Sequence, residues 1–96
     1  MALDDNFMVT GNSKSWYTYI VQCSDGTLYT GIARNIEERL LAHNSGSGAK
    51  YTRTRLPVIL VYHEEHPSRS LASRREYQLK KMTRTQKQKL IHENET

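Results

Sequence analysis

Cysteine is almost absent from this sequence of 96 residues, because Cys23 is the only one. A single thiol cannot form an internal disulfide, and one cysteine beside four histidines gives no cysteine-pair spacing for a structural zinc ion. The sequence therefore predicts a protein of a reducing compartment without a structural zinc site.

Long apolar segments are also missing. The longest apolar run, Val58 to Tyr62, is far too short to cross a bilayer, and no positively charged start is followed by an apolar stretch. We therefore expect a soluble, cytoplasmic protein with no membrane partner. The chain length allows one domain with a modest core, which leaves no room for a separate domain that binds a small-molecule cofactor.

Negative charge is scarce in one segment, although the net charge of the whole chain is only +4. Between Pro67 and His92 the single acidic residue is Glu76, whereas the basic residues are Arg69, Arg74, Arg75, Lys80, Lys81, Arg84, Lys87 and Lys89. A basic surface attracts polyanions because Lys and Arg replace the counterions of a phosphate backbone. A merely solvated helix face is the alternative, but such faces usually mix charge signs.

Two runs rich in aromatic and β-branched residues, Tyr17 to Cys23 and Thr27 to Ile32, flank the turn residues Ser24-Asp25-Gly26. This pattern predicts a β-hairpin. The length of its loop decides which side chains share a face, because a slip of one residue moves a side chain to the opposite face.

A two-residue loop, Asp25-Gly26, would place Tyr19 and Tyr29 on opposite faces. A three-residue loop with Gly26 as a bulge glycine would pair Val21 with Tyr29 and bring both tyrosines to one face. We predict the three-residue loop.

The next predicted helix begins after Asn35, with Glu38 completing a capping box. Ile36, Leu40 and His43 then fall on one helical face. The breaker cluster Asn-Ser-Gly-Ser-Gly, from Asn44 to Gly48, should end this helix. A loop is expected after it, carrying Lys50, Arg53 and Arg55.

The remaining predicted elements are a buried strand over Val58 to Tyr62, a helix from Leu71 to about Met82 capped by Ser70, and a short helix ending near His92. Thr83 and Gln86 form the capping box of the last helix. The order β-β-α-β-α-α predicts an α+β sandwich with a three-stranded sheet covered by helices. We expect one domain over 16–92, between a flexible lead at 1–15 and a polar tail at 93–96.

Glu76 is the most informative acidic residue. Ala72, Glu76 and Leu79 lie at i, i+4 and i+7, which places the carboxylate in line with a small apolar stripe. A charge there needs a partner, because burying it alone is costly. That partner is either a cation, such as Arg75 or Lys80, or a divalent metal ion. One carboxylate together with water and phosphate oxygens suits Mg²⁺.

Arg39 and His43 lie one helical turn apart and can project together. An arginine offers a planar donor fork for a phosphate, and an imidazole titrates near neutral pH. His43 has a simpler interpretation as a residue that favours the helix dipole. Tyr19 and Tyr29 likewise suit ordinary strand positions. The combination of all four with Glu76 indicates a phosphodiester-cleaving site more strongly than any member does alone.

The segments Tyr17-Thr18-Tyr19 and Tyr29-Thr30-Gly31, followed by Arg39 and Glu76, resemble the GIY-YIG nuclease family, most closely its small stand-alone bacterial members. The resemblance extends from Tyr17 to about Ile91. It implies a sandwich on a three-stranded antiparallel sheet, a requirement for Mg²⁺ or Mn²⁺, and hydrolysis of one DNA strand. DNA repair or recombination would be a setting for such an activity.

The resemblance also implies roles for individual residues: Tyr19 and Tyr29 are the two motif tyrosines, Arg39 binds phosphate, His43 supports the site and Glu76 binds the metal. A phenolate of Tyr29 or Tyr19 would activate the water that attacks the phosphorus, either directly or by helping to generate a metal-bound hydroxide. The sequence departs from the family at Ile32, where the related module of the bacterial excision-repair incision enzyme has a lysine.

These observations lead to one expected function, that of a metal-dependent DNA endonuclease. The basic residues expected to hold backbone phosphates without reading sequence are Arg53, Arg55, Lys80, Lys81 and Lys87. A non-catalytic nucleic-acid-binding module of the same fold is the alternative. A small interaction domain whose basic face binds an acidic protein is a third interpretation.

Overall fold

The computed structural model describes residues 15–95, so the predicted lead lies outside the described residues except for Ser15. The described elements follow in the order β2 (Trp16–Gln22), β3 (Leu28–Ala33), α2 (Ile36–Asn44), α3 (Lys50–Arg53), β4 (Ile59–His66), α4 (Arg69–Lys80) and α5 (Arg84–Glu95). This order confirms the predicted α+β class and adds the short helix α3.

The sheet has three antiparallel strands in the order β3-β2-β4, so β2 lies at its centre. In the hairpin, Val21 pairs with Tyr29 and Tyr19 pairs with Gly31. The loop is closed by Cys23, whose amide donates to the Thr27 carbonyl (2.8 Å), and Gly26 inside it has a φ of +86°. A positive φ favours glycine because it lacks a Cβ. The predicted three-residue loop is confirmed, and both tyrosines lie on one face.

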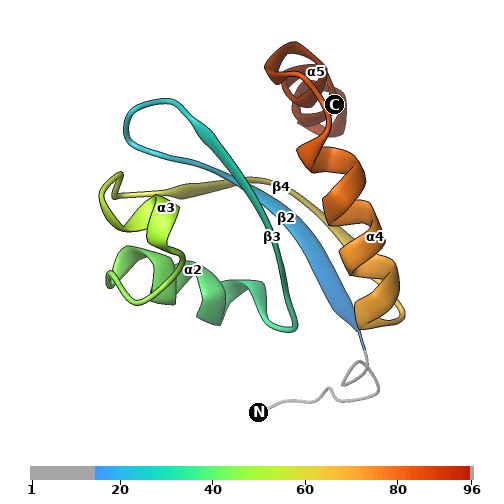
Figure 1. Cartoon of the computed structure of the whole chain (residues 1–96), viewed down its shortest axis with the longest axis horizontal. Helices are drawn as coiled ribbons and strands as arrows, with labels where there is room; N and C mark the ends of the chain where they lie inside the picture. Colours follow the sequence, from blue (N-terminus) through green and yellow to red (C-terminus); the bar gives the residue numbers. More distant parts are fainter. Residues whose placement is uncertain (1–14, 96) are drawn as a thin grey trace.

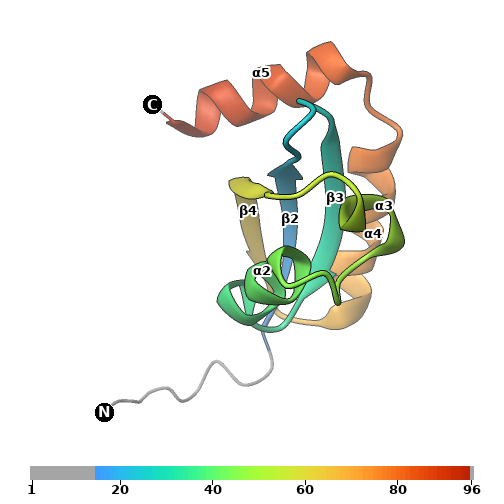
Figure 2. The same ribbon diagram turned by 90° about the vertical axis from the view of Figure 1, so that its left-hand side faces the viewer.

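Helices cover both faces of the sheet. Figures 1 and 2 show α2 and α3 on one face and α4 on the other, with α5 continuing beyond α4. Side chains alternate along β2, so Tyr19 and Val21 form a buried cluster toward α2, whereas Ile20 packs with Leu79 of α4. These two cores hold α2 and α4 at fixed positions relative to the central strand.

Two of the predicted helix starts are confirmed by their hydrogen bonds. The Asn35 side chain accepts from the Glu38 amide (3.0 Å) at the start of α2. Thr83 and Gln86 exchange reciprocal bonds at the start of α5, from the Thr83 amide to Gln86 Oε1 (2.9 Å) and from the Gln86 amide to Thr83 Oγ1 (3.1 Å). This reciprocal pair satisfies donors that the first helical turn leaves unpaired.

Other predicted boundaries are wrong. Ser68, not Ser70, caps α4 by accepting from the Leu71 amide (3.2 Å), so this helix begins two residues earlier than predicted. Helix α5 does not end near His92 but continues to Glu95. The sequence is polar both at the start of α4 and at the end of α5, and polar residues carry too little hydrophobic pattern to locate a helix end.

Strand β4 runs from Ile59 to His66, well beyond the predicted Val58 to Tyr62. It is an edge strand, so its polar half can pair with β2 while alternate side chains face solvent. The segment 50–53, predicted as loop, forms the helix α3. Among residues 15–95, no helix is long and apolar enough to cross a membrane.

Candidate active site

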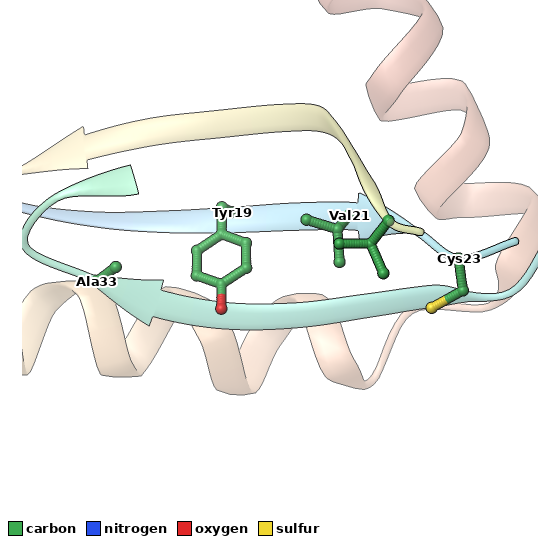
Figure 3. Close-up of a cluster of buried hydrophobic side chains, with 5 residues drawn as sticks. Tyr19, Val21, Cys23 and Ala33 are labelled. Carbon is green, nitrogen blue, oxygen red and sulfur yellow. The ribbon is translucent and has the colours of Figure 1, made fainter. Parts of the chain in front are cut away.

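The Tyr19 side chain lies at the centre of the candidate site. Its ring extends from β2 across the neighbouring strand β3, as Figure 3 shows. A Cβ on Gly31, the residue paired with Tyr19, would lie 2.6 Å from the Tyr19 hydroxyl oxygen and 2.8 Å from the ring. Only glycine therefore leaves room for this ring, which explains the glycine of the Tyr29-Thr30-Gly31 motif.

Helix α2 brings two further groups to the Tyr19 hydroxyl. Arg39 Nε donates to it at 3.3 Å, and His43 Nε2 lies 2.8 Å from it. Residues four apart share a helical face, which is why one helix can place both side chains on a single phenol. Tyr29 joins the same group, because its ring centroid lies 5.5 Å from that of His43. The structure thus brings together four of the five predicted catalytic side chains.

His43 is enclosed on its other side by the segment that follows α2. Its Nδ1 lies 2.8 Å from Thr52 Oγ1 of α3, and its side chain is fully buried. A Cβ on Gly48 would lie 2.6 Å from His43 Nδ1 and 2.8 Å from His43 Cα. Glycine at 48 thus has a packing role beyond the helix-ending role that the sequence predicts.

Burial governs the ionisation of both central groups. Burial raises the pKa of Tyr19, and the hydrogen bond and charge of Arg39 only partly offset it; Tyr29 and Glu76 add to the rise. Burial lowers the pKa of His43, and the charge of Arg39 lowers it further. His43 is therefore neutral at neutral pH. This argues against its simpler interpretation as a cation that favours the helix dipole.

No carboxylate of the described residues neutralises the charge of Arg39. Among residues 15–95, no carboxylate lies within ion-pair distance of its guanidinium. Arg39 also lines an open pocket of about 390 Å³ together with Asn35, Glu38 and Ala42. A partly buried guanidinium held by its Nε and facing an open pocket can bind an oxyanion with its remaining donors.

Ile32 lines the same pocket as Arg39. The lysine that the family resemblance suggests for this position would have brought a further cation to the pocket. In this protein the cations that line it are Arg34 and Arg39.

Glu76 lies on α4, on the opposite side of the sheet from α2. Its charge contributes to the raised pKa of Tyr19, but no hydrogen bond joins it to the other four predicted residues. Of the two cations considered from the sequence, Lys80 is its partner, with Nζ 3.2 Å from Glu76 Oε2. The Glu76 side chain is 24% exposed, so the prediction of a carboxylate in an apolar stripe holds only in part.

The donor set around Glu76 fits one kind of metal ion. Within the described part of the chain, no group of three His, Cys, Asp or Glu side chains is positioned to hold a metal. The described residues therefore offer no site with three protein ligands, which catalytic zinc usually has. A single carboxylate such as Glu76 remains suited to Mg²⁺, which takes one or two carboxylates and keeps several waters or phosphate oxygens.

The predicted nucleic-acid-binding residues differ in how freely they can bind a phosphate. Arg53 of α3 is exposed, whereas Arg55 donates to Asp25 (3.2 Å) and stacks on the Tyr51 ring at 4.0 Å. Lys80 is paired with Glu76, and Lys81 lies 4.7 Å from the Tyr77 ring centroid. Lys87 of α5 is partly buried. Arg55 therefore has a structural role that sequence analysis did not indicate.

Sequence analysis missed Thr52 and the contact role of Gly48. Both lie in the segment between α2 and β4, where α3 has four residues. A helix of about one turn has no hydrophobic period to detect, and nine residues separate Thr52 from His43. Only the side-chain contact reveals that they belong together.

Comparison with known proteins identifies the family of this chain. The family model described as the GIY-YIG catalytic domain matches residues 15–89. A UPF0213 protein of Staphylococcus haemolyticus is 56% identical over 77 residues, which cover 80% of this chain and 94% of that protein. A UPF0213 protein of Desulfotalea psychrophila is 54% identical over 82 residues, covering 84% of this chain and 74% of that one.

Two solution NMR structures are also similar. The UPF0213 protein of Bacillus halodurans is 42% identical, with a TM-score of 0.53 over 81% of this chain and 83% of that one. A protein from E. faecalis is 43% identical, with a TM-score of 0.58 over 85% and 88% of the two chains. With the motif tyrosines, Gly31 and Arg39 arranged as described, this chain belongs to the GIY-YIG family and is similar to its small bacterial UPF0213 proteins.

Proposed function

We propose that this protein is a divalent-metal-dependent endonuclease that hydrolyses phosphodiester bonds in DNA. The observation that carries the proposal is the state of Arg39, whose guanidinium is oriented by the Tyr19 hydroxyl, has no carboxylate partner in the described structure and faces an open pocket. Such a group stabilises the negative charge that develops on a phosphate during hydrolysis.

The two tyrosines have different roles in this proposal. Tyr19 is 2% exposed and hydrogen-bonded, so it positions Arg39 and His43. Tyr29 is only partly buried, and no described residue hydrogen-bonds to its hydroxyl. Its hydroxyl can therefore orient the attacking water. The water loses a proton to solvent as its oxygen forms the new bond to phosphorus, and the leaving oxygen takes up a proton from solvent as its bond to phosphorus breaks.

Glu76 would hold the metal ion, with water and phosphate oxygens as the other ligands. When bound, the ion would neutralise charge on the phosphate and the leaving oxygen. The present partner of Glu76 does not prevent this, because Lys80 is 53% exposed and an exposed i,i+4 pair contributes only about 0.3–0.5 kcal/mol.

A polyanionic substrate fits the basic side chains around this site. Arg53 is exposed on α3, which packs against the site through Thr52, and Lys81 and Lys87 add positive charge on the α4 and α5 side. Contacts of this kind attract a phosphate backbone without selecting a sequence. Specificity would then come from the structure of the DNA.

The deciding experiment is a cleavage assay of Glu76→Gln beside Lys80→Gln. Labelled single-stranded, duplex, flap and branched DNA are incubated with Mg²⁺ or Mn²⁺ at saturating protein, and thermal unfolding of each variant is measured without metal. Both variants lose the same ion pair, so we expect equal and small stability changes of about 0.5 kcal/mol or less. Only Glu76→Gln should abolish cleavage.

Three results would contradict the proposal. Cleavage at the wild-type rate by Glu76→Gln would remove Glu76 from the metal site. Binding of DNA without cleavage by the wild type would instead support a non-catalytic module. If the wild type neither binds nor cleaves DNA, the result would favour an acidic protein as the partner. A matched Glu95→Gln variant, changed at an exposed glutamate of α5, controls for the loss of one negative charge.

A further inference from the structure

Four hydrogen bonds link the candidate site to helix α3 in one continuous chain. They join Arg39 Nε to the Tyr19 hydroxyl (3.3 Å), this hydroxyl to His43 Nε2 (2.8 Å), His43 Nδ1 to Thr52 Oγ1 (2.8 Å), and Thr52 Oγ1 to the Ala49 carbonyl (3.0 Å). The two ends have a fixed direction, because a guanidinium can only donate and a carbonyl can only accept.

A neutral His43 can fit into this chain in two ways. With the proton on Nδ1, Nδ1–H donates to Thr52, the Thr52 hydroxyl donates to Ala49, and Nε2 accepts from the Tyr19 hydroxyl. All four hydrogen bonds then form. The Ala49 carbonyl also accepts from the Arg53 amide (3.2 Å), which its two lone pairs allow.

With the proton on Nε2, the order is reversed and fewer bonds form. Nε2–H would donate to Tyr19, and Thr52 would have to donate to Nδ1 instead of Ala49. The Tyr19 hydroxyl proton would then have no acceptor in the chain. Tyr19 is 2% exposed, and His43 and Thr52 are fully buried. An unpaired hydroxyl in such surroundings is unfavourable, so the first arrangement is the stable one.

We propose that Thr52 is a positioning residue that holds His43 in the Nδ1–H tautomer, so that His43 Nε2 accepts the proton of the Tyr19 hydroxyl. Thr52 does not face the pocket and acts only through His43. Gly48 supports the same arrangement, since its lack of a Cβ lets the backbone pack against the imidazole. No feature of the sequence between 44 and 58 assigns a function to Thr52.

The consequence for chemistry rests on the proposed nuclease function. In the Nδ1–H tautomer, the Tyr19 hydroxyl donates to His43 Nε2 while its oxygen accepts from Arg39 Nε. The phenol and the imidazole both stay neutral, as burial favours for each. No anion then forms beside the Arg39 guanidinium, so its positive charge stays available for the phosphate.

The test reads the tautomer directly. ¹⁵N NMR of the imidazole nitrogens of His43, assigned with a His43→Gln sample, is recorded at neutral pH for the wild type, Thr52→Val and Thr52→Ser. Valine keeps the shape of threonine without its hydroxyl, and serine keeps the hydroxyl. We expect a protonated Nδ1 in the wild type and in Thr52→Ser, and a mixture of tautomers in Thr52→Val.

A wild-type spectrum with the proton on Nε2 overturns the proposal, and so does an unchanged Nδ1–H tautomer in Thr52→Val. This readout needs no DNA, so a protein with the expected tautomer but no cleavage would refute the proposed nuclease function alone. Where cleavage is measured, Thr52→Val should slow it by about 10–100-fold, by analogy with the loss of a hydrogen-bond partner that orients a metal-binding histidine, and Thr52→Ser should restore it.

Discussion

Arg39 and Arg75 lie on opposite faces of the same sheet, and each donates its Nε to a group on a strand. Arg75 donates to both carboxylate oxygens of Glu64 (3.0 Å each), and this carboxylate also accepts from Tyr62 and contacts His66 Nε2 at 3.0 Å. Arg39 donates to the neutral Tyr19 hydroxyl instead (3.3 Å).

The two arginines thus differ in what balances their charge. On the α4 face, burial raises the pKa of Glu64, but hydrogen bonds from Tyr62 and Arg75 and the charge of Arg75 outweigh it and lower the pKa overall. The pair is internally neutral and stabilises the fold. On the α2 face, neutral partners leave the positive charge of Arg39 available for a ligand. A protein can thus use similar arginine contacts for stability on one face and for binding on the other.

The largest effect should follow from Arg39→Ala. Removing a donor that stabilises developing charge costs about 10²–10³-fold in rate, so we expect a loss of this size in DNA cleavage. Stability should fall by only about 1 kcal/mol, the usual contribution of one hydrogen bond. Single-turnover cleavage and urea unfolding on the same preparation measure both. A variant that cuts DNA normally would show that the unpaired charge has no catalytic role.

Arg75→Ala should give the opposite pattern. Loss of the guanidinium leaves the partly buried Glu64 carboxylate without its arginine partner. We therefore expect a destabilisation of about 1–3 kcal/mol, between the values for exposed and buried ion pairs. Cleavage by the folded protein should be close to wild type. Urea unfolding, with cleavage measured well below the unfolding temperature, checks this. If cleavage fell as strongly as in Arg39→Ala, the two faces would not be functionally distinct.

Lowering the pH should reduce folding stability in two steps, first through His43 on the α2 face and then, at lower pH, through Glu64 on the α4 face. The pKa of His43 is lowered from 6.5, so the unfolded state binds its proton first, and folding stability should fall as pH drops below about 6.5. The pKa of Glu64 is lowered from 4.5, so its contribution is complete above about 4.5 and lost only at lower pH. His43→Gln should flatten the upper part of the profile and Glu64→Gln the lower part.

Urea unfolding at closely spaced pH values measures these slopes. Equal slopes between pH 6.5 and 5 in the wild type and His43→Gln would show that the imidazole is not held neutral by burial.

The smallest effects should come from two single cations outside the candidate site, the exposed Arg53 and the partly buried Lys87. Arg53→Ala and Lys87→Ala each remove one phosphate contact from a different side of the molecule, so each should lower the slope of log affinity against log salt by about one unit if DNA reaches that side. Titration with labelled duplex at several salt concentrations identifies the side. An effect of Arg53→Ala alone would restrict DNA to the α2 and α3 face, and no effect in either would exclude both residues.

Much of the fold was predictable because the signals were local. Asn35 and the Thr83–Gln86 pair marked helix starts by their own hydrogen-bonding chemistry, and the Ser24-Asp25-Gly26 turn set the register that brings Tyr19 and Tyr29 to one face. The extent of β4 was not predictable, because its polar half is stabilised by pairing with β2 and not by hydrophobic pattern.

Local turn chemistry and helix periodicity were enough to set the hairpin register and the face of α2 that carries Arg39 and His43. Contacts formed on folding decide that the Tyr19 ring leaves no room for a Cβ at Gly31, that Glu76 pairs with Lys80, and that Thr52 contacts His43. They also leave Arg39 with no carboxylate partner among the described residues. These facts depend on distances between segments far apart in the chain, and no local pattern records which side chains will meet after folding.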